Sequence, residues 1–161
     1  RLDRDVFYGA APLAFWIQAL AFRIARPQGI VVRALSDGYR AAAVWAATSL
    51  VDGGAVAFAT SATMVALGGI HLFPPTHYGH LSSVATLWSA VAVLDGRPWL
   101  AGLSVGIAVL GRYSAGLVAV AGVAVAASIV GAPGDGLVVA GIAMLPAVLL
   151  AIARPAAAGW F

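Results

Sequence analysis

Long apolar stretches separated by short polar or Gly/Pro-rich turns run through the chain and constrain its fold more than any other feature. About 17–25 consecutive apolar residues are enough for a helix to cross the hydrocarbon core of a bilayer. Turn signals such as Pro74-Pro75 and Asp95-Gly96-Arg97-Pro98 separate stretches of about this length. The pattern predicts an all-α fold, a polytopic bundle of transmembrane helices.

Seven spans follow from these boundaries. The first four are expected at Phe7–Ile24, Ile30–Val51, Ala55–Phe73 and Tyr78–Leu94. Trp99–Val130 is too long for one span at about 1.5 Å per residue. We expect it to break at its only polar interruption, Gly111-Arg112-Tyr113, which leaves a short fifth span. The seventh follows the turn Ala132-Pro133-Gly134-Asp135 and ends near Arg154.

The composition supports a membrane protein. The chain has 161 residues, of which 62% are hydrophobic and 9% charged. Soluble domains average about 45–50% apolar and about 25% charged residues. Nine arginines and six aspartates are too few to give a soluble domain a polar exterior. The net charge of +3 does not indicate a nucleic-acid partner, because the arginines are scattered between apolar stretches. The absence of cysteine excludes disulfides and thiol catalysis.

The placement of arginine predicts the orientation, since cytoplasmic ends of membrane helices carry an excess of basic residues. An extracytoplasmic N-terminal segment puts five arginines on the cytoplasmic side: Arg23, Arg26, Arg33, Arg112 and Arg154. It puts three on the other side, namely Arg1, Arg4 and Arg97, together with Asp3, Asp5, Asp52, Asp95 and Asp135. We therefore expect a multi-pass protein of the cell (plasma) membrane. Residues 1–161 form a single transmembrane domain, which we expect to be a fragment of a larger protein.

Two groups of ionisable residues are candidates for chemistry. Asp3 and Asp5 precede the first span, where carboxylates can bind a divalent cation or act as a general base. The alternative is a solvated flank. Arg33, Asp37 and Arg40 share one face of the second helix at i, i+4 and i+7. Charges within a span usually pair, so we favour an Asp37 ion pair with one of these arginines over a functional polar path.

Three histidines surround the loop after the third span: His71, His77 and His80. Neutral imidazole is a good zinc ligand. No cysteine or glutamate completes such a set, and Pro74-Pro75 separates His71 from the other two. An interfacial histidine cluster beside Tyr78 is the favoured interpretation, and no metal site is predicted.

Arginine and glycine motifs elsewhere in the chain have structural interpretations. Arg112 lies between two apolar segments, where it either extends to the headgroups or binds an anionic phosphate. Gly102 and Gly106 form a small-xxx-small pair, which we interpret as helix packing. Gly131-Ala-Pro-Gly-Asp-Gly136 lacks the strand and the lysine of a phosphate loop, so a turn is predicted there.

Taken in order, several segments resemble the early part of GT-C-fold glycosyltransferases, specifically the dolichyl-phosphate-mannose mannosyltransferase and ArnT-like (family 39-like) group. These segments are Arg4-Asp5-Val6-Phe7, Ala11-Pro12-Leu13-Ala14-Phe15-Trp16, Ala21-Phe22-Arg23-Ile24, Val32-Arg33-Ala34-Leu35-Ser36 and the stretch Gly96–Ala108, followed by Arg112. The resemblance covers roughly Arg4 to Val118. His80 departs from it, since many members carry an acid before the fourth span.

The resemblance implies transfer of a sugar from a polyprenyl-phosphate donor to an acceptor on the extracytoplasmic face. An acidic residue would deprotonate or orient the acceptor hydroxyl. Asp5 is the best match for that rim of the active site and Asp3 the second, although the family's principal catalytic acid normally precedes this part of the chain. The resemblance implies that basic groups, or a divalent cation in some members, stabilise the departing phosphate, and it requires no cofactor.

Two other classes of function remain open on the sequence alone. A transporter or permease would show broken helices around a midplane site, and Gly111-Arg112 is the single hint of one. A non-catalytic membrane assembly subunit is the other alternative. Under the glycosyltransferase interpretation, we expect the 161 residues alone to lack transfer activity.

Overall fold

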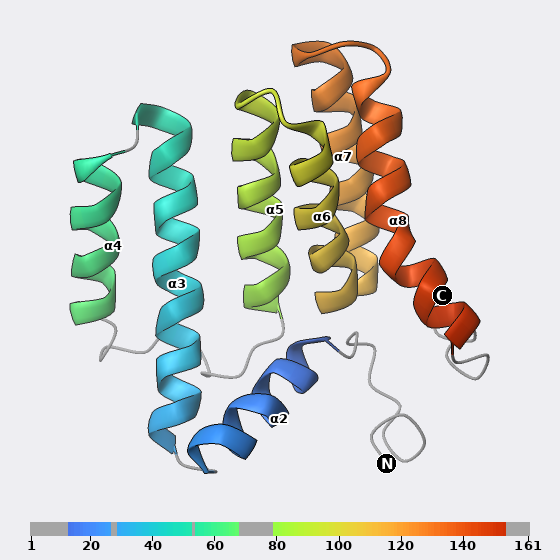
Figure 1. The fold of residues 1–161 in the computed structure, drawn as a ribbon. Coiled ribbons are helices and arrows are strands. Elements are labelled where there is room, and N and C mark those ends of the chain that lie inside the picture. Colours follow the sequence, from blue (N-terminus) through green and yellow to red (C-terminus); the bar gives the residue numbers. More distant parts are fainter. Residues whose placement is uncertain (1–12, 27–28, 53, 68–78, 154–161) are drawn as a thin grey trace.

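The described part of the chain consists of seven helices and the turns between them, without a strand. A computed structural model of the protein describes residues 13–26, 29–52, 54–67 and 79–153 (Figure 1). The helices are α2 (Leu13–Ala25), α3 (Gly29–Asp52), α4 (Ala55–Leu67), α5 (Gly79–Leu94), α6 (Pro98–Gly111), α7 (Tyr113–Val130) and α8 (Asp135–Ala153). The all-α fold expected from the sequence is confirmed for these residues.

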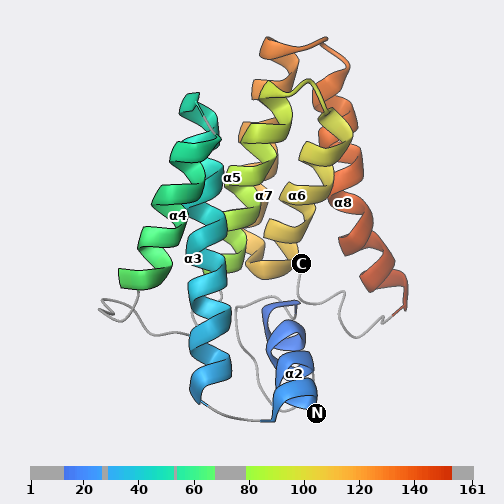
Figure 2. The same ribbon diagram turned by 60° about the vertical axis from the view of Figure 1, so that its left-hand side comes forward.

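Six of the helices, α3 to α8, run alternately up and down beside one another (Figures 1 and 2). We call the end at which α3 and α7 finish the upper end and the opposite one the lower end. Helix α6 is the centre of the bundle and packs against α5, α7 and α8. Helix α4 lies at the edge and packs against α3. The succession of apolar stretches in the sequence predicts this alternation of helix direction.

Helix α2 departs from the expected arrangement. The sequence predicts a first span at Phe7–Ile24 beside the others, but α2 lies obliquely beneath the lower ends of α5 and α6 (Figures 1 and 2). It packs against α3 and α6. Space exists there because α6 has 14 residues and α3 has 24, which correspond to about 21 and 36 Å of helix. The lower part of α3 therefore extends below α6 and gives α2 a surface to pack on.

The turn between α5 and α6 forms where the sequence predicts it. Helix α5 ends in a Schellman motif, in which the N–H of Gly96 donates to the carbonyl of Val93 at 3.0 Å and the N–H of Arg97 donates to the carbonyl of Ala92 at 2.8 Å. Gly96 has a φ of 66°, which a residue without a Cβ adopts freely. Pro98 then starts α6 with a preset φ at a position that needs no N–H donor.

The break predicted at Gly111-Arg112-Tyr113 is also confirmed. Arg112 has φ −158° and ψ 108°, an extended conformation that interrupts the helical path. Its N–H donates to the carbonyl of Ala108 at 2.9 Å, and its carbonyl accepts the N–H of Gly116 at 2.8 Å. Arg112 is thus the single residue that connects α6 to α7, which runs back antiparallel to it (Figure 1). The break is a turn between two helices and not a discontinuity within one span.

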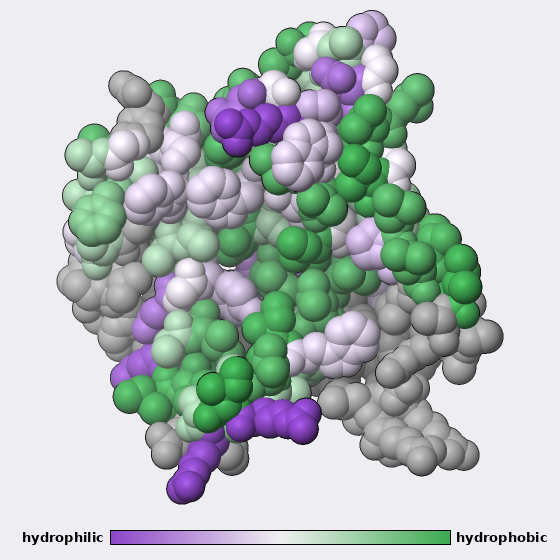
Figure 3. All heavy atoms as spheres, in the orientation of Figure 1, coloured by the Kyte–Doolittle hydropathy of each residue, from purple (hydrophilic) through white to green (hydrophobic). Residues whose placement is uncertain are grey.

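The interior of the bundle is built from small side chains. The largest described side chains with less than 2% exposure are Val105, Val109, Val139, Ser36 and Ser89. Many large apolar side chains lie on the outside, for example Leu137 (79% exposed) and Ile129 (76% exposed), although Leu81 is buried. Figure 3 shows an apolar surface over the middle of the bundle, with hydrophilic residues toward its two ends.

Helix length limits which elements could cross a membrane. Among the described helices, α7 alone is both long and apolar enough to do so by length and composition. Four shorter apolar helical segments accompany it, namely Leu13–Ala25, His80–Leu94, Pro98–Gly111 and Asp135–Leu149.

Candidate functional site

The two residues with the strongest sequence case for catalysis, Asp3 and Asp5, lie outside the described residues, and so do His71 and His77. Their roles stay predictions. His80 is the second residue of α5 and is half-buried at the lower end of the bundle. Within the described ranges, no three His, Asp or Glu side chains come together in a way that would hold a metal ion.

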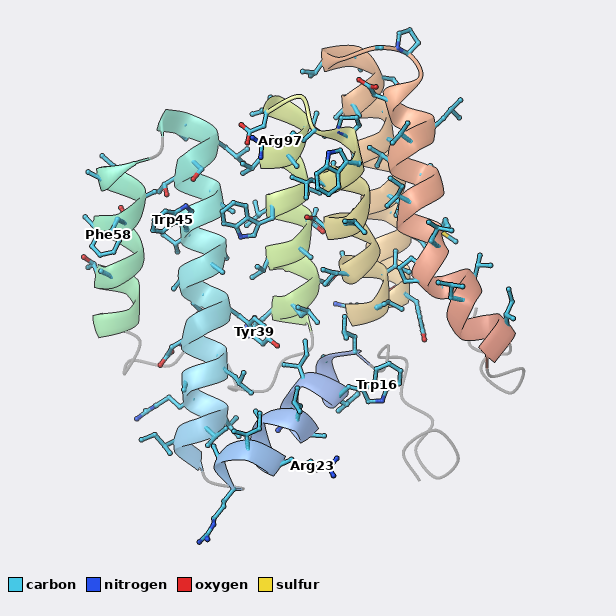
Figure 4. All side chains as sticks on the ribbon, in the orientation of Figure 1. Trp16, Arg23, Tyr39, Trp45, Phe58 and Arg97 are labelled. Atoms are coloured by element: carbon cyan, nitrogen blue, oxygen red, sulfur yellow. The ribbon has the colours of Figure 1, made fainter. Side chains whose placement is uncertain are left out.

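Charged residues in the described part of the chain segregate between the two ends. The lower end carries Arg23 and Arg26 at the end of α2, Arg33 near the start of α3, and Arg112 between α6 and α7. The turns of the upper end carry Asp95, Arg97 and Asp135. Figure 4 shows Arg23 below α2 and Arg97 at the α5–α6 turn, at opposite ends of the molecule. The described charges therefore make the lower end basic, whereas the turns of the upper end carry two aspartates and one arginine.

The charged face of α3 contains the ion pair that the sequence favoured. The Nη1 atom of Arg40 lies 3.4 Å from the Oδ1 atom of Asp37, and their side chains are 22% and 17% exposed. Tyr39, between them in sequence, points toward the lower end of α5 (Figure 4). The pair therefore lies at about the level where α5 begins, in the lower part of the bundle. A pair at this spacing neutralises two charges on an otherwise apolar helix.

A polar junction joins α5, α6 and α7 at this same end. The Oγ atom of Ser82 on α5 donates a 3.2 Å hydrogen bond to the carbonyl of Ala108 on α6. That carbonyl also accepts the N–H of Arg112, the residue of the break. A Cβ on Gly111 would lie 3.3 Å from the N atom of Ser82, a close contact that would require one of the two helices to shift slightly. The junction fixes the half-buried Arg112 and Tyr113 beside the first turn of α5.

The glycine pair of α6 packs helices, as the sequence predicts. A Cβ on Gly102 would lie 2.8 Å from the Cβ of Ile142, and one on Gly106 would lie 3.0 Å from the carbonyl oxygen of Ala143. Both glycines are buried against α8. Small residues at this spacing let two helix backbones approach closely, so the pair is explained by packing.

The glycine-rich segment between α7 and α8 is a turn and not a phosphate loop. The Oδ2 atom of Asp135 accepts the N–H of Ala132 at 2.9 Å, which closes the turn before α8. The Oγ atom of Ser128 donates to the carbonyls of Ala124 and Pro133, at 3.1 and 3.3 Å. Asp135 at the upper end of the bundle therefore has a structural role.

Hydroxyl groups inside the bundle are the feature that the sequence analysis missed. On α5, the hydroxyls of Thr86 and Ser89 donate back to the carbonyls of Ser82 and Thr86, at 2.8 and 2.6 Å. On α3, Ser36 is fully buried and its Oγ atom has no hydrogen-bond partner in the described structure. The i, i+4, i+7 spacing of Ser82, Thr86 and Ser89 could have predicted these bonds. Hydroxyl groups in apolar surroundings bond to carbonyls of their own helix.

The two ends of the bundle differ in the charged residues that they expose. At the upper end Asp95 and Arg97 are exposed, and the lower end presents arginines that suit an anion.

No family model matches this chain, and no curated protein or solved structure matches it.

Proposed function

We propose that this chain is a bundle of membrane-embedded helices and part of a glycosyltransferase that takes a sugar from a polyprenyl-phosphate carrier. The observation that supports the membrane placement is the distribution of side-chain size. A helical bundle in water buries its large apolar residues, whereas helices in lipid pack through small residues and expose large ones to the acyl chains. Here the largest fully buried side chains of the described residues are valine and serine, whereas many leucines and isoleucines, such as Leu137 and Ile129, are exposed.

The tryptophans and arginines support the same placement. Trp16, in α2 at the lower end, is 43% exposed, and Trp99, at the upper start of α6, is 53% exposed. Tryptophan favours both interfaces of a bilayer, and arginine favours the cytoplasmic one. Under this proposal the lower end faces the cytoplasm and the upper end faces the extracytoplasmic side.

The glycosyltransferase part of the proposal depends on the resemblance of the segments between Arg4 and Val118. It assigns Asp5, with Asp3 second, as the group that deprotonates or orients the acceptor hydroxyl on the extracytoplasmic side. Helix α2 (Leu13–Ala25) lies at the lower end, on the proposed cytoplasmic side, whereas the resemblance assigns Asp5 to the opposite side. The side on which Asp5 lies is therefore the sharpest point to test. The break at Arg112 is a simple turn between two helices, so it does not support the transporter alternative.

Cysteine labelling tests the orientation, because the chain has no cysteine of its own. Asp5→Cys and Arg97→Cys should react with a membrane-impermeant maleimide in intact cells that express the natural protein in full. Arg26→Cys should react only after the cells are permeabilised. Labelling of Asp5→Cys only after permeabilisation would refute its proposed role.

Sugar transfer tests the reaction. Membranes that contain the full protein should transfer a sugar from a polyprenyl-phosphate-linked donor to an acceptor. Asp5→Asn should lower kcat by about 10²- to 10⁴-fold, the usual contribution of a general base. Asp95→Asn, an exposed carboxylate on the same side, is the matched control and should leave kcat within a small factor. Equal loss in both variants, or no effect in either, contradicts the assignment.

A further inference from the structure

Three arginines gather where α2 meets α3, and we call Arg23, Arg26 and Arg33 the basic corner. Arg23 lies in the last turn of α2, Arg26 follows that helix, and Arg33 lies in the second turn of α3. All three are exposed. In Figure 4 the side chain of Arg23 extends below α2, away from the bundle.

The backbone of Arg26 indicates that its side chain matters. Arg26 has a φ of 63°, and it is the single described residue other than glycine with a positive φ. Glycine adopts this conformation freely, whereas a residue with a Cβ adopts it at a cost. The turn alone would be better served by glycine, yet the position carries an exposed cation.

The surroundings of the basic corner indicate its ligand. Helix α2 carries the exposed apolar residues Trp16, Leu20 and Ile24. A surface with apolar side chains and arginines side by side suits the boundary between acyl chains and headgroups. The phosphate of a headgroup accepts the paired N–H groups of a guanidinium.

We propose that the basic corner binds the headgroups of anionic phospholipids in the leaflet that it faces. This inference rests on the membrane placement proposed above but not on glycosyl transfer. Each arginine near an anionic leaflet contributes a factor of about five in affinity. Arg112 lies at the same end but half-buried between α6 and α7, so it is not part of this surface.

Lipid binding to the detergent-purified full protein tests the proposal. Native mass spectrometry after incubation with equal amounts of phosphatidylglycerol and phosphatidylcholine should show preferential retention of phosphatidylglycerol. Arg23→Gln, Arg26→Gln and Arg33→Gln should each lower that preference by about fivefold, and the triple variant should nearly abolish it. Arg97→Gln, at the upper end, is the matched control and should preserve it.

Arg26→Gly separates the charge from the backbone. It should lower the preference as much as Arg26→Gln does, without lowering the midpoint of thermal unfolding, because glycine relieves the positive φ. Arg26→Lys should retain most of the preference. Inorganic phosphate should not displace phosphatidylglycerol, and displacement would indicate a site for free anions and overturn the proposal.

Two outcomes separate failure of this inference from failure of the membrane placement. Equal retention of both lipids by a protein that resists alkaline extraction from membranes overturns the basic corner alone. Release of the protein from membranes by alkaline carbonate overturns the membrane placement, and the inference with it.

Discussion

The hydroxyl of Ser82 on α5 and the carbonyl of Ala108 on α6 form a 3.2 Å hydrogen bond between two helices at the point where α6 ends. The same carbonyl accepts the N–H of Arg112, so one oxygen serves both the contact between helices and the turn into α7. The bond lies among small residues, close to Gly111. It therefore ties the start of α5 to the α6–α7 connection at the lower end of the bundle.

Ser82→Ala should lower the free energy of unfolding by about 0.6–1.7 kcal/mol, the range for hydrogen bonds between membrane helices. The effect is modest because the Ala108 carbonyl keeps its second donor. Ser83→Ala, the exposed neighbour on the same helix, is the control and should change the stability little. Reversible unfolding of the purified protein in mixed micelles gives both values, and equal effects would show that the bond contributes nothing specific.

Gly116→Ala should destabilise the protein by about 1–3 kcal/mol, because added volume in a packed interior forces its neighbours apart. A Cβ at Gly116 would overlap the backbone of Val109, and the two helices meet there directly after the one-residue turn. Gly122→Ala on the same helix meets nothing within 4 Å. It should stabilise the protein by up to about 1 kcal/mol through helix propensity. If Gly116→Ala lowers the free energy of unfolding and Gly122→Ala raises it in the same assay, the α6–α7 contact is supported. Changes of the same sign in both variants contradict it.

Local chemistry explains why the helix ends were predictable. The Schellman turn at Gly96, the break at Arg112 and the cap at Asp135 depend on residues within one or two turns of each other. The sequence therefore predicted a turn or a break at each of these places, although not the Schellman geometry or the side-chain bond of Asp135. The ion pair of Asp37 with a neighbouring arginine was also predictable from spacing along one helix, and Arg40 forms such a pair.

Long-range packing explains what the sequence did not predict. The position of α2 depends on the difference in length between α3 and α6, which leaves a surface free at the lower end. The bond from Ser82 to Ala108 joins residues 26 positions apart, and no local pattern specifies its partner. The candidate catalytic residues Asp3 and Asp5 lie outside the described residues, so their assignment depends on the resemblance alone.

Val125→Asp distinguishes a bundle in lipid from one in water. Val125 is 59% exposed on α7, away from both ends of that helix. An acidic side chain there should cost up to about 2.5–3.5 kcal/mol in a membrane, the cost at the centre of a span, because the charge would face hydrocarbon. The same change on a water-exposed surface usually stays within about 0.5 kcal/mol.

Leu94→Asp is the matched control for Val125→Asp. Leu94 is 58% exposed, but it lies at the upper end next to Asp95. The Leu94→Asp change should be tolerated whether the bundle lies in lipid or in water. The yield of membrane-inserted protein and its unfolding in micelles report the difference, and a harmless Val125→Asp would argue against the membrane placement.

Joint replacement of Asp37 and Arg40 tests whether their pair is structural. The two side chains are mostly buried, so Asp37→Asn alone leaves a partly buried cation and should cost about 1–3 kcal/mol. The double variant Asp37→Leu/Arg40→Met removes both charges and retains similar volume. The stability of the double variant should be close to that of the unchanged protein, as in other replacements of buried ion pairs by apolar residues.

A double-mutant cycle by unfolding in micelles gives the interaction energy of Asp37 and Arg40. If sugar transfer by the full protein survives in the stable double variant, the pair serves the fold. If transfer is lost while stability is unchanged, these charges belong to a functional polar path instead.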